Sequence, residues 1–308
     1  MKALILTDGK AGHENQSKAF ARSIGCDFDI LPVRFKSKPA KALSYLLDNI
    51  GIRTTVLFDG LKKLHKDSSY DLVIGTGSGT FYPAKTAGRI LGIPCGVVLL
   101  PSGYHIKSFD CILAPEFDNP PPLPNVVKIP VNLVSVDQEF YKSGIKAFQE
   151  KHACNAQTVD AAAIIIGGPN KCAAMSPEWM KAQLDGIFSE HKAANREIWV
   201  TTSRRTPPEV EKVVESYPFD YKLIYSKDQF NPIPAFVSLA SHLYVTAEST
   251  GMLSEACSFG KAQVHVLDNL NPGLHKFRRF AQYCSSLGNR KIDLSESFSR
   301  AKKLLKIG

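Results

Sequence analysis

Residues 245–261 read Val245-Thr-Ala-Glu-Ser-Thr-Gly-Met-Leu-Ser-Glu-Ala-Cys-Ser-Phe-Gly-Lys261, and this segment decides the fold. The apolar run 239–245 that leads into it predicts a buried strand. Ser249 or Thr250 is suited to cap a helix that begins near Gly251, and another apolar run follows that helix. A strand, a polar turn, a short helix and a second strand in this order are typical of a parallel α/β sheet.

The same segment indicates a ligand site. A turn from a parallel strand into a helix directs backbone N–H groups and the positive end of the helix toward one point, which suits a phosphate. Glu248 and Glu255 are seven residues apart and share a helix face if the helix starts early. Carboxylates beside a phosphate are better suited to sugar hydroxyls, so the segment predicts a nucleotide-sugar pocket. The alternative is that a glutamate in such a turn only caps the helix.

Length and composition describe a two-domain protein. A chain of 308 residues is long enough to form two hydrophobic cores. Its content of 44% hydrophobic and 22% charged residues is ordinary for a globular protein. Its seven cysteines are scattered and include no C-x-x-C pair, which favours a reducing compartment over a disulfide framework or a structural zinc site. The amino-terminal apolar run is too short for a signal peptide and predicts a first strand instead. We therefore expect a cytoplasmic protein.

The net charge of +9 implies an acidic partner, and the basic residues are concentrated in one segment. Between residues 34 and 66 there are eight Lys or Arg residues and only two Asp residues, with apolar side chains interleaved. Such a segment can dock on the anionic surface of a membrane, here the inner membrane face. The alternative is an amphipathic helix that packs on the core and leaves a solvated basic side. Nucleic acid is not expected as a partner, because no recognised nucleic-acid motif is present.

Short apolar runs alternate with helical stretches in both halves of the chain, which predicts α/β architecture. We expect two Rossmann-like, doubly wound domains facing each other across a cleft, at residues 1–153 and 160–290. A polar linker is expected near 152–160, and residues 291–308 are expected to form a separate basic helix at the carboxyl terminus.

The turn after the first strand holds the catalytic candidates. Gly9 and Gly12 allow a tight turn before a helix expected near Asn15. His13 lies on this turn, where an imidazole with a pKa near ~6.5 can take a proton from a sugar hydroxyl. Asp8 or Glu14 would orient the ring; the alternative is that His13 only caps or packs. Gln16 follows in the same cleft-facing stretch.

Two further turns are candidates for the acceptor side. The stretch 75–80 contains three alternate glycines, including Gly77 beside Ser78, but lacks the G-K-[ST] ending of a phosphate loop. It therefore predicts a close approach of a ligand or domain, or simply a tight turn. Glu116 and Asp118 follow the strand 111–114 and would contact an acceptor or another loop.

The second half offers phosphate-binding candidates at its strand ends. Gly167 and Gly168 would expose backbone amides to a pyrophosphate, with Asn170 and Lys171 beside them. The stretch Ser203-Arg204-Arg205-Thr206 places two arginines at a strand end, where they suit bidentate phosphate binding. The alternative is one arginine paired with a carboxylate of a neighbouring domain and the other solvated. Thr206-Pro-Pro-Glu209 also predicts a capping box that opens the next helix.

Four ordered motifs resemble the elongated-mitochondria family, whose members include plant mitochondrial fission factors and bacterial relatives described as glycosyltransferases or nucleotide-sugar epimerases. The motifs are Asp8-Gly9-x-x-Gly12-His13-Glu14-x-Gln16, Ile166-Gly167-Gly168, Ser203-Arg204-Arg205-Thr206-Pro207 and Thr246-x-Glu248-Ser249-x-x-Met252-x-x-Glu255-Ala256. The resemblance covers nearly the whole chain. Thr250 and Gly251 depart from it, because a serine-like residue and a bulkier neighbour would be expected there.

The resemblance implies a GT-B-like architecture, with a nucleotide-sugar donor in the second domain, an acceptor in the first and His13 as the catalytic residue. The donor candidates are Gly167, Gly168, Asn170, Ser203, Arg204, Arg205, Thr206, Glu248, Ser249, Thr250, Gly251, Met252 and Glu255. No D-x-D pair framed by strands is present, so we expect no metal and no cofactor. The leading hypothesis is a metal-independent glycosyltransferase acting on an envelope or lipid-linked glycan. The alternatives are a nucleotide-sugar epimerase on the same scaffold and a non-catalytic, membrane-associated adaptor.

Overall fold

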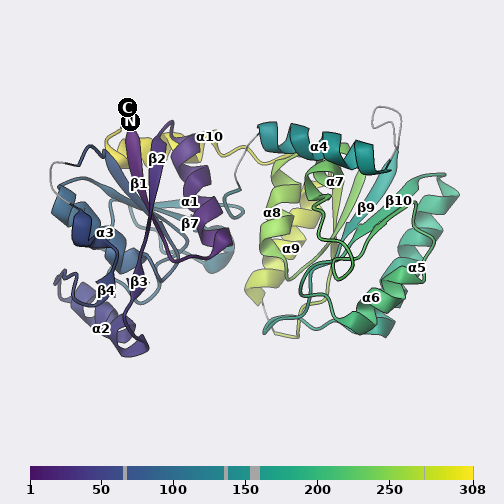
Figure 1. Ribbon diagram of the computed structural model, residues 1–308, viewed down its shortest axis with the longest axis horizontal. Helices are drawn as coiled ribbons and strands as arrows, with labels where there is room; N and C mark the ends of the chain where they lie inside the picture. Colours follow the sequence, from purple (N-terminus) through teal and green to yellow (C-terminus); the bar gives the residue numbers. More distant parts are fainter. Residues whose placement is uncertain (65–67, 135–137, 153–159, 274, 308) are drawn as a thin grey trace. The chain divides into compact units, whose positions relative to one another are not determined.

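Apolar strands that alternate with amphipathic helices build two parallel sheets (Figure 1). The computed structural model describes residues 1–64, 68–134, 138–152, 160–273 and 275–307. Unit 1 contains Met1–Val136 and Asp293–Gly308, and unit 2 contains Asp137–Ile292. Both sheets are wholly parallel and carry helices on both faces, so the prediction of two doubly wound α/β domains is confirmed. The cleft between them stays a prediction.

The sheet of unit 1 has the strand order β2-β1-β5-β6-β7-β8. Its strands are β1 (Lys2–Thr7), β2 (Asp27–Pro32), β5 (Leu72–Thr76), β6 (Cys95–Val98), β7 (Cys111–Pro115) and β8 (Val126–Ile129). The helices of this unit are α1 (Ala11–Ser23), α2 (Lys38–Asn49), α3 (Phe81–Leu91) and α10 (Ser295–Leu305). A small antiparallel ribbon of β3 (Arg34–Phe35) and β4 (Phe58–Asp59) stands apart from the main sheet. Short 3-10 turns occupy Leu61–Lys63, Ile106–Ser108 and Glu116–Asp118.

The sheet of unit 2 has the strand order β11-β10-β9-β12-β13. Its strands are β9 (Ala161–Ile165), β10 (Glu197–Thr201), β11 (Tyr221–Leu223), β12 (His242–Thr246) and β13 (Gln263–Leu267). Its helices are α4 (Gln138–His152), α5 (Pro177–Ala193), α6 (Pro208–Glu215), α7 (Ile233–Leu239), α8 (Thr250–Ser258) and α9 (His275–Leu287). In each unit the strand order reverses beside the first strand, between β1 and β5 and between β9 and β12. Ligands of open α/β sheets bind at this switch point, beyond the carboxyl ends of the strands.

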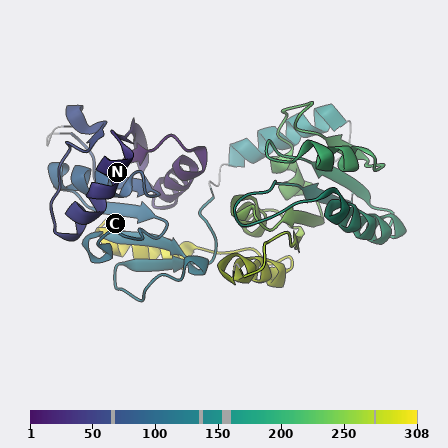
Figure 2. The same cartoon turned by 90° about the horizontal axis from the view of Figure 1, so that it is seen from below.

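Alternating side chains of β1 divide the core of unit 1 into two layers. Leu4 and Leu6 pack on the side of α3, whereas Ala3 and Ile5 pack on the side of α1 and α10. Figure 2 shows α10, in yellow, beside the blue strands β7 and β8 of this unit.

The division of the chain differs from the predicted boundaries 1–153, 160–290 and 291–308. Helix α4 belongs to unit 2, because the fully buried ring of Phe148 packs against Trp199, Tyr221 and Phe236. The terminal helix is not separate, because Leu305 of α10 is buried in the core of unit 1. Both placements follow from burial of apolar side chains. Most of the predicted linker, 153–159, lies outside the described residues.

Candidate functional site

Asp8 and His13 form a hydrogen-bonded pair at the switch point of unit 1. Nδ1 of His13 lies 3.0 and 3.1 Å from the two carboxylate oxygens of Asp8. The side chain of His13 is 22% exposed and that of Asp8 is 11% exposed. The pair is therefore held in place while the imidazole stays accessible. Helix α1 begins at Ala11 rather than near Asn15, which puts His13 in its first turn.

The charge of Asp8 decides which ring nitrogen of His13 can accept a proton. Burial alone would raise the pKa of Asp8, but the neighbouring charges and hydrogen bonds of His13 and Lys10 outweigh it and lower the pKa below its ordinary value. An ionised carboxylate only accepts hydrogen bonds, so Nδ1 of His13 carries the proton that it donates. In the neutral imidazole Nε2 therefore holds the free lone pair and is the atom that can accept a proton.

The glycine-rich loop after β5 is built around this pair. A Cβ at Gly77 would lie 2.3 Å from Cε1 of His13, and a Cβ at Gly79 would lie 2.7 Å from Cβ and Oδ2 of Asp8. Gly77 also has a φ of +81°, a conformation that favours glycine. These glycines therefore make room for the two catalytic candidates, whereas the close approach of a ligand or of the other domain stays a prediction.

Other candidates of unit 1 have different surroundings. Glu14 accepts a hydrogen bond from Thr7 at 3.1 Å and pairs with Lys18 at 2.7 Å, so Asp8 and not Glu14 orients His13. Gly12 belongs to α1 and not to the turn, whereas Gly9 has a φ of +80° in the turn.

Three further candidates complete this edge of unit 1. Oε1 of Gln16 is buried without a hydrogen-bond partner among the described residues. Glu116 is exposed and Asp118 is half-buried in the 3-10 turn after β7. No contact between these two carboxylates and the Asp8–His13 pair is found in the described part of the chain.

In unit 2, the carboxylate of Glu248 ties three strand ends together. Oε1 accepts a hydrogen bond from the backbone N–H of Gly168 at 2.8 Å, and Oε2 accepts one from Nδ2 of Asn269 at 2.8 Å. The hydroxyl of Thr246 donates to Oε1 at 3.1 Å and accepts from the N–H of Gly167 at 2.9 Å. The Glu248 side chain is fully buried. The predicted contact of Glu248 with sugar hydroxyls stays a prediction. In the structure, both of its carboxylate oxygens bind the loops that follow the neighbouring strands.

The Gly167–Gly168 turn leaves no room for side chains. A Cβ at Gly167 would lie 1.8 Å from Oε1 of Glu248, and a Cβ at Gly168 would lie 2.1 Å from the carbonyl oxygen of Arg205. The two glycines thus let the loop after β9 approach the loops after β12 and β10. Asn170 lies further out, and its side chain accepts a hydrogen bond from the N–H of Cys172.

The two arginines after β10 differ in their contacts. Arg205 is 43% exposed, lies 3.7 Å from Glu248 and donates to the carbonyl of Gly168 at 3.3 Å. Arg204 is exposed. The carboxylate beside Arg205 belongs to the same unit, whereas the alternative expects one from a neighbouring domain; phosphate binding by the two arginines stays a prediction.

The predicted capping box at Thr206 is wrong. Helix α6 begins at Pro208 without a side-chain cap, and Thr206 instead donates to the carbonyl of Gly167 at 2.5 Å. Its oxygen also accepts the N–H of Ser203 at 2.9 Å. Thr206 and Ser203 therefore fasten the arginine loop to the glycine turn.

Helix α8 begins at Thr250 with Ser249 as its N-cap residue, as predicted, but Ser249 makes no capping hydrogen bond. Gly251 is exposed and Met252 half-buried in the first turn. Glu255 points elsewhere: it accepts a hydrogen bond from Tyr141 of α4 at 2.6 Å, and burial raises its pKa. Glu248 and Glu255 therefore do not act together.

Two contributors were not singled out from the sequence. Asn269 follows β13 at the same edge and holds Glu248; the rule that ligand sites follow parallel strands would have identified it. Lys41 of α2 donates to Oγ of Ser78 at 2.8 Å and thereby contacts the glycine loop. No pattern in the sequence connects residues so far apart.

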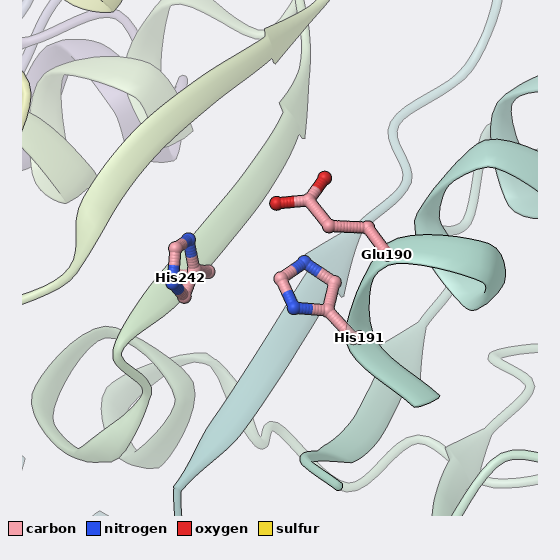
Figure 3. A group of neighbouring side chains, drawn as sticks. All are labelled: Glu190, His191 and His242. Carbon is pink, nitrogen blue, oxygen red and sulfur yellow. The ribbon is translucent and has the colours of Figure 1, made fainter. Parts of the chain in front are cut away.

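A separate histidine group lies at the amino end of β12 (Figure 3). Glu190, His191 and His242 hold potential metal-ligand atoms within 4.8 Å of one another. Nδ1 of His191 lies 3.4 Å from Arg196, which only donates, and Nε2 lies 2.8 Å from the hydroxyl of Tyr244. Nε2 therefore carries the proton. Tyr244 in turn donates to Glu190 at 3.3 Å.

His191, Tyr244 and Glu190 consequently form a directed hydrogen-bond chain. Nδ1 of His242 lies 3.0 Å from Nε2 of His265. Burial lowers the pKa of His191, as it does for His242 and His265. The group lies at the end of the sheet opposite to Thr246 and Glu248. It therefore lies apart from the candidate site.

Comparison with known proteins gives a family match over most of the chain. Residues 11–292 match the family described as mitochondrial fission ELM1. An uncharacterized protein of Rickettsia prowazekii (strain Madrid E) is 24% identical, over 100% of this chain and 97% of that protein. The mitochondrial fission protein ELM1 of Arabidopsis thaliana is 23% identical, over 74% of this chain and 59% of that protein.

Solved structures with a similar fold are sugar-nucleotide epimerases. The UDP-GlcNAc 2-epimerase of Methanocaldococcus jannaschii has a TM-score of 0.56 at 12% identity, with 100% of both chains covered. The UDP-GlcNAc 2-epimerase of Neisseria meningitidis, bound to UDP-GlcNAc, has a TM-score of 0.54 at 13% identity, covering 99% of this chain and 100% of the other. At such identities the likeness shows the fold alone, which is the predicted GT-B-like pair of Rossmann-like domains.

Proposed function

The chain belongs to the mitochondrial fission ELM1 family, and from this premise we propose that it is a metal-independent glycosyltransferase. It moves a sugar from a nucleotide-sugar donor to an envelope or lipid-linked glycan acceptor. The observation that carries this proposal is the Asp8–His13 pair at the switch point of unit 1. An ionised carboxylate that fixes an accessible imidazole is the arrangement of a general base.

The transfer step follows from the free lone pair on Nε2 of His13. Nε2 removes the proton of an acceptor hydroxyl while its oxygen attacks the anomeric carbon of the donor. The bond from that carbon to the diphosphate oxygen breaks, and its electron pair leaves with the nucleoside diphosphate. Asp8 stabilises the imidazolium that forms. The anomeric configuration is inverted.

Unit 2 would bind the leaving diphosphate. Arg204 and Arg205 supply positive charge, and the uncapped first turn of α8 supplies N–H groups at the positive end of a helix. The buried carboxylate of Glu248 holds the surrounding loops in register for this task.

A thermal-shift screen with nucleoside diphosphates and nucleotide sugars, including UDP-GlcNAc, tests the donor site. Ligand at ~100 times its dissociation constant adds about 2.7 kcal/mol to the free energy of unfolding. We expect one nucleotide to raise the melting temperature selectively, and Arg205→Ala to abolish the shift. Arg279→Ala, at an exposed position of the same unit, is the matched control. If no nucleotide binds, the adaptor hypothesis replaces the enzyme.

The second candidate is a nucleotide-sugar epimerase, favoured by the full-length fold likeness to UDP-GlcNAc 2-epimerases. An epimerase needs no acceptor. Incubation with the nucleotide sugar alone distinguishes the two: isomerised product without acceptor would replace the transferase proposal.

Helix α2 favours a peripheral contact with the membrane, because part of its apolar surface is exposed, although Tyr45 and Leu47 pack against the core. Its buried side chains are the polar Ser44 and Asp48, whereas Leu46 and Ile50 are each 60% exposed. Ion pairs with Lys85 at 2.7 Å and Arg53 at 3.1 Å compensate the buried charge of Asp48. Beyond the helix, Ile52 and Val56 are exposed as well. The alternative, an amphipathic helix that packs on the core and leaves a solvated basic side, is supported by the core contacts of Tyr45 and Leu47 and is the outcome if no vesicle binds.

The proposed location is the cytoplasmic face of the inner membrane, with the basic segment 34–66 against anionic lipid. Residues 65–66 of this segment lie outside the described residues. Among the residues described, no helix combines the length and apolarity needed to cross a bilayer. Cosedimentation with anionic vesicles, lost in Leu46→Gln/Ile50→Gln and absent with neutral vesicles, tests the contact.

A further inference from the structure

An open cavity in unit 1 connects the catalytic candidate Asp8 to the basic segment. Its volume is about 570 Å³, and its walls come from β3, β4, the start of α2 and the glycine loop. Four cationic side chains line it: Arg34, Lys36, Lys38 and Lys41. Asp8 and Asp59 are its acidic members, so the lining carries a surplus of two positive charges. We call it the basic cavity.

The cations of the basic cavity have no carboxylate partner within ion-pair distance in the described part of the chain. Lys41 donates to the hydroxyl of Ser78, which is neutral. By contrast, Asp8 is already engaged by His13 and by Lys10 at 3.3 Å. Four unneutralised cations on one concave surface repel one another, and a bound anion would remove that repulsion.

The position of the lysines on α2 strengthens this point. Lys38 and Lys41 lie in the first turn, where the helix end is itself positive and acidic residues are favoured. That turn contains no acidic residue. Both lysines therefore reduce the stability of α2 in the protein alone and would be compensated by an anion in the basic cavity.

We propose that the basic cavity binds a phosphate or pyrophosphate group of the sugar acceptor. The inference rests on the proposed transferase function and names the acceptor class: a glycan or lipid that carries phosphate near the hydroxyl to be glycosylated. Asp8 and Gly79 form one end of the cavity, and Asp8 excludes the phosphate from that end by like charge. The phosphate lies against the lysines, and the acceptor hydroxyl extends toward His13.

Titration calorimetry with inorganic pyrophosphate tests this inference. Lys36→Gln/Lys38→Gln should weaken binding by about tenfold or more, since hydrogen bonds to charged groups contribute most to such sites. Lys62→Gln/Lys107→Gln removes the same charge from exposed positions outside the cavity and should change binding less than about twofold. An equal loss of pyrophosphate affinity in the two double variants, or no pyrophosphate binding by the wild type, would overturn the inference.

Pyrophosphate could also occupy the donor loops of unit 2, so a second variant separates the two sites. Binding that survives in Arg204→Ala/Arg205→Ala belongs to the basic cavity and supports the inference. Binding lost there and retained in Lys36→Gln/Lys38→Gln overturns it while leaving the donor site intact. If nucleotide sugars fail to bind but cavity-dependent pyrophosphate binding persists, the proposed function fails and the anion site stands.

Vesicles distinguish a lipid-linked acceptor from a soluble one. Phosphatidylcholine vesicles with phosphatidic acid present the same phosphate on a lipid surface. Binding that requires both the lysines and the apolar side chains Leu46 and Ile50 supports the cavity with a lipid source. Pyrophosphate binding that requires the lysines, without vesicle binding, supports the cavity with a soluble source.

Discussion

The two switch points share a topology but use their carboxylates in opposite ways. In unit 1, Asp8 leaves the imidazole of His13 22% exposed, and cations without carboxylate partners lie nearby. In unit 2, the Glu248 side chain is fully buried and accepts hydrogen bonds from Gly168 and Asn269. A carboxylate at a strand end can therefore orient a reacting group or fasten loops, and its hydrogen-bond partners decide which.

Glycines mark both places for the same steric reason. Gly77 makes room for a ring that would act on substrate, and Gly167 makes room for a carboxylate that acts on the protein. We expect substitutions in unit 1 to reduce turnover with the fold intact, and substitutions in unit 2 to reduce stability and donor binding.

The largest effect is expected at His13. His13→Ala should lower kcat by about 10²–10⁴-fold, the usual contribution of a general base. The nucleotide-induced thermal shift should not change, because the proposed donor loops lie in unit 2. Steady-state kinetics with the donor found in the screen, together with that shift, make the check. Unchanged turnover would remove His13 as the base.

The second largest effect is expected for Gly77→Ala, which should lower kcat by roughly a hundredfold, because small displacements of a catalytic group have effects of this order. The new Cβ lies within 2.8 Å of both ring nitrogens of His13 and must displace the ring. Gly186→Ala is the control, because a Cβ there meets nothing within 4 Å. Equal activity of both variants would mean that the ring position does not matter.

Glu248→Ala should lower the free energy of unfolding of unit 2 by about 2 kcal/mol, because it leaves buried donors unpaired. Both tryptophans, Trp179 and Trp199, belong to unit 2, so their fluorescence in urea reports on this unit. Pyrophosphate binding by the basic cavity should persist. Loss of pyrophosphate binding in Glu248→Ala would show that the basic cavity of unit 1 depends on the loops around Glu248 in unit 2.

The smallest effect is expected from pH. Burial lowers the pKa values of His191, His242 and His265 below the ordinary value of 6.5. The unfolded chain then binds more protons, so the stability of unit 2 is complete above pH 6.5 and falls as the pH drops below it. Tryptophan-detected urea unfolding at pH 7.5 and 5.5 measures the change. His242→Gln/His265→Gln should reduce the difference; an unchanged slope would assign it to other groups.

The sequence predicted the parallel sheets and the placement of candidates after strands, because strand and helix periods are local properties. It did not predict the partner of each side chain. Thr206 has the pattern of a capping residue, yet its hydroxyl bonds the Gly167 carbonyl, which comes from another strand end. Likewise α2 buries the charged Asp48, which pairs with Lys85, 37 residues away, while the apolar Leu46 of the same helix is exposed. Such contacts depend on tertiary packing, which no local pattern encodes.

The path of the chain through α10 also orders the events of biosynthesis. The core of unit 1 includes Ala301, Leu305 and Ile307, whereas all of unit 2 lies between that helix and the rest of unit 1. A ribosome therefore releases every residue of unit 2 before the last helix of unit 1. Unit 2 can fold on the nascent chain while unit 1 waits for α10. During this interval, of the helices that the structure describes, α1 alone covers the face of the sheet on which α10 packs, and β7 and β8 lack their helix, so chaperones have most to protect then.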